Sequence, residues 1–100
     1  MKCIEIITLR SLAQADRQLV NELLRQVFKE KESGLPASIR VYHHSIVETD
    51  LSIHIYWESE PGSQDKSPLG LRLSYVLKPL GLLNHSVWVE TAAREFVARD

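Results

Sequence analysis

The spacing of apolar residues changes several times along the chain, and the order of these changes limits the folds open to it. Residues 3–9 read CIEIITL, a β-prone segment that is apolar on both alternating sets, as in a central strand buried on both faces. In residues 12–28 the apolar side chains recur at three- and four-residue spacing, which predicts an amphipathic helix. Ser11 begins a capping-box pattern at its start, and Gly34 and Pro36 supply its stop.

Two half-polar segments follow the first predicted helix. In residues 37–44 the odd positions 37, 39 and 41 are apolar, and in residues 51–58 all the odd positions are apolar, whereas the even positions of both segments are polar or aromatic. Matching parity and a short connection predict an antiparallel hairpin. The register that we expect pairs Tyr42 with His54 and Arg40 with Tyr56.

A second helix and a last strand complete the pattern. Residues 60–66 form the most polar, breaker-rich stretch and are expected to be a mobile loop. Ser67, followed by a proline, is typical of a helix start, and Gly81 of its end. Pro79 should weaken the last turn, because proline lacks a backbone donor. Residues 85–90 alternate again and are expected to form the fourth strand.

The order strand-helix-strand-strand-helix-strand predicts an α+β, ferredoxin-like domain, with a four-stranded antiparallel sheet and both helices on one face. The 100 residues fit one domain, spanning 1–100, of which 91–100 form a C-terminal tail. The other face would expose an aromatic patch larger than monomers usually leave uncovered. We therefore expect a homodimer that packs sheet against sheet. Its interface is expected to include Arg40, Tyr42, His54, Tyr56 and Trp88, with Ile4, Ile6 and Thr8 added if the first strand shares their parity.

Composition argues against several classes of partner. The formal net charge is −1 and no basic stripe is present, which argues against nucleic acid as a partner. RNA-recognition modules share this element order, but their Gly-aromatic signature is absent from residues 51–58. Apolar runs are far shorter than the roughly 20 residues that span a bilayer. With Cys3 as the single cysteine and no secretion signal, we expect a cytoplasmic protein.

The element order, the terminal strand and Trp57 at the end of the third strand resemble the dimeric α/β barrels of the antibiotic biosynthesis monooxygenase type, over roughly residues 3–90. The resemblance implies a pocket between sheet and helices for a small apolar or aromatic ligand, with cofactor-free monooxygenase-like activity. Trp57, Tyr75 and Arg72 would bind that ligand. The haem-degrading branch adds an asparagine on the first strand and a histidine on the second helix, and this chain has neither. We therefore expect no cofactor. The alternative is a non-catalytic interaction or regulatory module.

Several single residues have more than one interpretation. Glu5 falls in a central strand, where an unpaired carboxylate would be costly. It is either paired by Arg40 or Arg72, a functional acid, or, as we favour, near solvent at the strand end. His44 and His54 could share a face, but their spacing is a weak metal signal, and we expect no metal site.

Overall fold

The structure is a computed structural model that describes residues 2–11, 21–26, 36, 38–47, 49–58 and 66–91. Its strands are β1 (Cys3–Ser11), β2 (Ser38–His43), β3 (Asp50–Trp57) and β4 (Gly81–Val89). Helix α2 spans Pro68–Leu77 and continues as a 3-10 turn, η1, over Lys78–Leu80. Residues 21–26 are also helical. The predicted loop at 60–66, except Lys66, and the tail beyond residue 91 lie outside the described residues, as does the predicted start of the first helix after Ser11.

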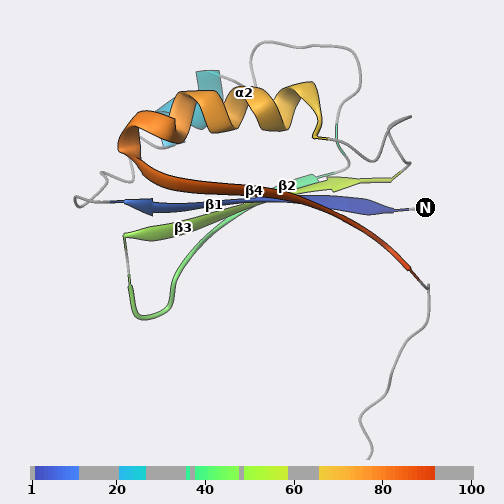
Figure 1. Cartoon of the computed structure of the whole chain (residues 1–100), viewed down its shortest axis with the longest axis horizontal. Coiled ribbons are helices and arrows are strands. Elements are labelled where there is room, and N and C mark those ends of the chain that lie inside the picture. The colour runs from blue at the N-terminus through green and yellow to red at the C-terminus, as the bar shows by residue number, and fades with distance from the viewer. Residues whose placement is uncertain are drawn as a thin grey trace, which may run out of the picture.

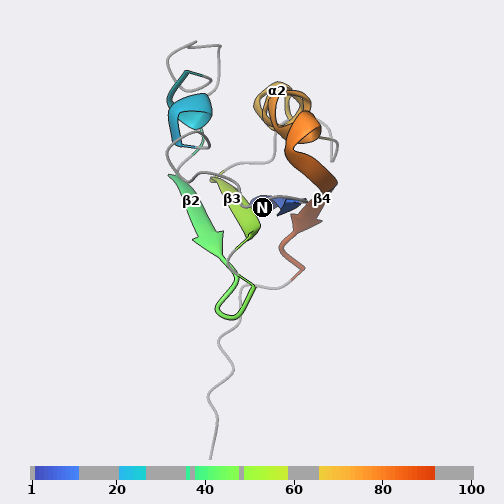
Figure 2. The same ribbon diagram turned by 90° about the vertical axis from the view of Figure 1, so that its left-hand side faces the viewer.

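The strands form one antiparallel sheet in the order β2-β3-β1-β4. Helix α2 and the helical residues 21–26 lie on the same side of that sheet (Figures 1 and 2). This confirms the predicted ferredoxin-like α+β fold. Because β1 has a neighbour on each side, its mixed apolar sequence is that of a central strand, as expected. Among the described residues, no helix has the length and apolar character needed to cross a membrane.

The core lies between the sheet and the helices. It is built from odd-numbered strand residues together with Leu24, Leu73 and Leu77 from the helical side. Along β1 the odd residues are buried, and the even residues point to the open face, which no described helix covers. The register pairs Ile4 with Tyr56 and Ile6 with His54, so β1 shares the parity of the hairpin. The strand contributions to the core are Ile7, Leu9, Leu51, Ile53 and Ile55.

The predicted hairpin register is wrong by two residues. Arg40 pairs with His54, and Tyr42 pairs with Ser52. The turn between the two strands is the reason. The His44 backbone N–H donates to the Asp50 carbonyl at 2.8 Å, which places His44 opposite Asp50. The His44 ring also accepts backbone N–H groups from residues 46 and 47 through Nδ1, at 3.1 and 3.0 Å. A shift of two residues preserves side-chain parity, so the predicted faces remain correct.

Helix α2 begins as predicted. The Ser67 hydroxyl accepts the Gly70 backbone N–H at 3.0 Å, and a proline occupies the first turn. The α-helix ends before Pro79 and tightens into η1, as the proline requires. Strand β4 starts at Gly81, four residues earlier than predicted, because η1 passes directly into the sheet edge. A side chain at Gly81 would overlap the Arg10 carbonyl, so this close approach requires glycine.

Candidate functional site

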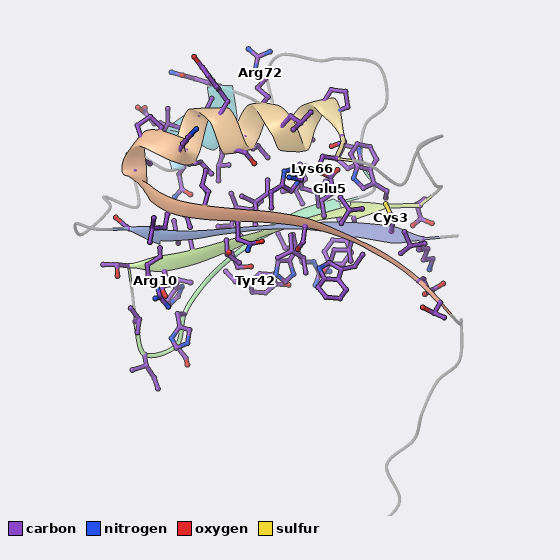
Figure 3. All side chains as sticks on the ribbon, viewed as in Figure 1. Cys3, Glu5, Arg10, Tyr42, Lys66 and Arg72 are labelled. Carbon is purple, nitrogen blue, oxygen red and sulfur yellow. The ribbon has the colours of Figure 1, made fainter. Side chains whose placement is uncertain are left out.

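Glu5 is buried within the central strand β1, with 1% of its surface exposed. Its side chain points toward the helical side of the sheet (Figure 3). The expectation that it lies near solvent is therefore wrong. Pairing with Arg40 is also wrong, because Arg40 is an even-numbered residue exposed on the open face.

Three donors from three different segments bind the Glu5 carboxylate. The Trp57 indole N–H donates to Oε1 at 2.9 Å, from the end of β3. On β4, the His85 Nε2 lies 2.8 Å from Oε2. The Ser67 backbone N–H, just before α2, donates to Oε2 at 3.2 Å. The carboxylate thus exchanges its hydration for directed hydrogen bonds, without which its burial would be very costly.

The sheet register explains why these side chains meet. Glu5 lies directly opposite Ile55 on β3 and Val87 on β4. Trp57 and His85 are each two residues from those partners, so they share the face of Glu5 and approach it diagonally. We call Glu5, its partners Trp57, Ser67 and His85, and Ser74 of α2, which contacts His85, the carboxylate cluster.

Helix α2 provides the space above the carboxylate at Gly70. A Cβ atom at this position would overlap Glu5 Oε2 and lie 2.8 Å from both Cε1 and Nε2 of His85. Gly70 is buried in the first turns of α2, where glycine is otherwise unfavourable. The absence of a side chain therefore lets the Glu5–His85 pair fit beneath the helix.

His85 connects the buried carboxylate to α2. Its side chain is 6% exposed, and its second ring nitrogen, Nδ1, lies 3.2 Å from the Ser74 hydroxyl. Ser74 is half-buried on α2. Both ring nitrogens are thus occupied, and a continuous hydrogen-bonded chain runs from Glu5 through His85 to Ser74.

The structure does not bring the three predicted ligand residues together. Trp57 is half-buried against the core and belongs to the carboxylate cluster. Arg72 lies on the side of α2 that faces away from the sheet (Figure 3), and Tyr75 is 81% exposed. Helical periodicity accounts for this result, because Leu73 and Leu77 direct the opposite side of α2 into the core.

The five predicted interface residues do share the open face. The ring of His54 lies 4.7 Å from that of Tyr42 and 6.3 Å from that of Tyr56, between centroids. The Arg40 guanidinium lies 5.9 Å from the Tyr56 ring centroid, and Trp88 is 60% exposed. Loss of hydration raises the pKa of Tyr56 above its ordinary value of 10.0, with a further increase from Tyr42, which Arg40 partly opposes.

A groove of about 570 Å³ lies at one end of the sheet. Most of its lining comes from even-numbered residues of the open face, among them Thr8, Arg10 and Tyr42. Figure 3 shows Arg10 and Tyr42 on the side opposite α2. This groove is therefore separate from the carboxylate cluster.

Other candidate residues have structural contacts. Across the described ranges, no group of three or more His, Cys, Asp or Glu side chains is arranged to hold a metal ion. His54 is within 2.8 Å of the Ser52 hydroxyl, whereas His44 binds its own turn. Cys3 is buried, as expected of a small apolar residue.

No protein-family model and no curated protein sequence matches the chain. Solved structures do match it over nearly its whole length. Rv0793 from Mycobacterium tuberculosis aligns with a TM-score of 0.63 at 15% identity, covering 95% of this chain and 100% of that one. A candidate antibiotic biosynthesis monooxygenase from Deinococcus radiodurans gives a TM-score of 0.65 at 15% identity, covering 96% and 99%. The chain has the antibiotic biosynthesis monooxygenase-like fold. SnoaB, a cofactor-independent oxygenase from Streptomyces nogalater, shares it with a TM-score of 0.63 at 9% identity, covering 92% and 95%.

Within this antibiotic biosynthesis monooxygenase-like fold, sequence reasoning identified Trp57 and suspected Glu5 but missed His85. The haem-degrading branch has its histidine on the second helix, whereas His85 lies on β4. One signal was available, because residues 5, 57 and 85 all have the odd parity that faces the helices. Ser67 and Gly70 could not be found this way, because their roles depend on how α2 sits over the sheet.

Proposed function

We propose that the protein is a cofactor-independent oxygenase that acts on a small apolar or aromatic compound. The observation that carries the proposal is the carboxylate cluster, a buried Glu5–His85 pair hydrogen-bonded to Trp57 within an otherwise apolar core. Replacing buried hydrogen-bonded polar partners by apolar groups of the same shape is often nearly neutral for stability. A cluster of this kind is therefore better explained by chemistry than by folding.

The pair has the groups needed for proton abstraction. An oxygenase without metal or flavin must draw electrons for O₂ reduction from the substrate itself. Removing a proton from a phenol or an activated CH₂ group makes the substrate a stronger electron donor. Glu5 would accept this proton. His85, whose Nε2 lies 2.8 Å from Oε2, would hold the carboxyl group in position, and the Trp57 ring would form an apolar wall for an aromatic substrate.

Oxygen uptake tests this function directly. The purified protein is incubated in air with a series of hydroxylated polycyclic aromatic compounds, and O₂ consumption is recorded together with product mass. We expect uptake with at least one compound, and a product that has gained one oxygen and lost two hydrogens.

Two histidines provide a matched pair of variants for this assay. His85→Gln should lower the rate by about 100-fold or more, the usual contribution of a positioned acid–base group. His54→Gln, on the open face, should leave the rate close to that of the wild type. No uptake with any compound, or equal rates for the two variants, would contradict the proposal.

We also propose that the protein is a homodimer formed through the open face. This face presents Trp88 at 60% and Tyr42 at 42% exposure. Contiguous aromatic surface of this kind usually marks an interaction site, and most homodimers are two-fold. Trp88→Asp should give a monomer by light scattering, whereas Tyr75→Asp, on α2, should not change the mass. A dimeric Trp88→Asp variant would refute this assignment.

A non-catalytic interaction module is the second candidate. The groove of about 570 Å³ favours it, because the groove lies on the open face and not beside Trp57. Its volume falls within the range of small-molecule sites. A thermal-shift screen separates the two candidates. Stabilisation that disappears in Trp57→Phe supports a site at the carboxylate cluster, whereas loss only in Tyr42→Ala supports the groove.

A further inference from the structure

The carboxylate cluster contains one polar group that the proposed reaction does not use, the Ser74 hydroxyl. Glu5 is 1% exposed and the His85 side chain 6% exposed, so neither group meets solvent freely. Ser74 is half-buried at the outer end of the same hydrogen-bonded chain. The other contacts of the carboxylate, the Trp57 indole and the Ser67 backbone N–H, are donors that cannot accept a proton.

We propose that Ser74 and His85 form the route by which a proton held at Glu5 exchanges with solvent. This inference deepens the proposed function, because it rests on Glu5 as the group that takes the substrate proton. Ser74 is then a positioning and proton-transfer residue on α2. It does not touch the substrate.

The transfer uses the two hydrogen bonds of the structure, Glu5 to His85 and His85 to Ser74, and ends with transfer of a proton from Ser74 to water. It begins with a protonated Glu5 carboxyl and with the His85 ring proton on Nδ1, donated to Ser74 Oγ. The carboxyl proton moves to Nε2, the Nδ1 proton moves to Ser74 Oγ, and the original Ser74 proton passes to water. Glu5 is left as a carboxylate that accepts from Nε2–H, and no electrons are transferred. The reverse sequence returns a proton from water to Glu5.

Exchange of the His85 ring proton with water measures this route without any substrate. The chain has four histidines, and labelling them with ¹⁵N gives ring N–H signals, of which that of His85 is assigned by its loss in His85→Gln. We expect Ser74→Ala to slow this exchange by about tenfold or more, since a positioned proton-transfer group commonly contributes more than that. Ser74→Thr keeps the hydroxyl and should restore the wild-type rate.

Ser52→Ala is the matched control. It removes a hydroxyl 2.8 Å from the His54 ring on the open face, and it should leave the exchange at His85 unchanged. An unchanged or faster exchange in Ser74→Ala would overturn the proposal, because water would then reach the ring by another path. The assay contains no oxygenase substrate, so slow exchange in Ser74→Ala together with no O₂ uptake would reject the proposed function alone.

Discussion

Replacing Gly70 with alanine should destabilise the protein, although the same change in most helices stabilises. Alanine gains about 1 kcal/mol over glycine inside a helix. Here the new methyl group would overlap Glu5 Oε2 and lie 2.8 Å from two atoms of the His85 ring. The carboxylate cannot retreat easily, because Trp57 and Ser67 hold it as well.

The expected magnitude follows from these opposing effects. Overpacking a buried site costs about 1–3 kcal/mol, and a lost hydrogen bond to a charged group costs about 1.5–3 kcal/mol. After the helix-propensity gain, Gly70→Ala should lower the free energy of unfolding by about 1.5–5 kcal/mol. Urea denaturation followed by circular dichroism measures this change.

A control in the same helix separates local packing from general effects on α2. Tyr75→Ala changes a side chain that is 81% exposed and should alter stability by no more than about 0.5 kcal/mol. Glu5→Ala removes the oxygen that the new methyl group would overlap, so Gly70→Ala should cost less in that background. A Gly70→Ala protein as stable as the wild type would refute the packing of α2 on the Glu5–His85 pair.

Two further substitutions and one titration test the same geometry. Glu5→Gln should lower the free energy of unfolding by about 1–3 kcal/mol, measured in urea. The NH₂ group of the glutamine must face the N–H of either Trp57 or Ser67, donor against donor. Equal stability would mean that these contacts are absent. Trp57→Phe keeps an aromatic ring but removes the donor to Oε1, and should cost about 1.5–3 kcal/mol by the same measurement. Because its pKa is raised, the fold favours the neutral phenol of Tyr56 over the phenolate. The contribution of Tyr56 to the free energy of unfolding is therefore present below pH 10.0 and is lost as pH rises through the higher folded-state pKa. An ultraviolet titration should therefore show a late tyrosinate transition that is missing in Tyr56→Phe, and its persistence there would assign the shift to another tyrosine.

The fold could be predicted from the sequence because hydrophobic period and strand parity are local properties. The alternation in 51–58 and the cap at Ser67 each predicted an element that the structure contains. The hairpin register depended on how the turn closes. The His44 ring holds that turn through two backbone N–H groups, and no periodicity reports such a contact.

The candidate site was harder to predict, because its members are far apart in sequence. Trp57 and Glu5 are 52 residues apart, and His85 and Glu5 are 80 apart. Arg72 and Tyr75 were chosen by residue type alone, whereas Tyr75 is 81% exposed and Arg72 lies on the side of α2 that faces away from the sheet. Their placement follows from Leu73 and Leu77, which fix the buried side of the helix.

Glu5 shows what a single unusual residue can reveal about a site. Glu5 places a carboxylate at a buried position of the central strand, whereas the other buried positions of β1, Cys3, Ile7 and Leu9, are apolar. Such a residue must be either tolerated at an edge or satisfied by partners in the fold. The structure shows three partners from β3, β4 and the start of α2, together with a glycine that makes room for them. An apolar residue at position 5 would need none of these arrangements. Their convergence on one carboxylate is the physical reason to seek the chemistry of this protein beneath α2.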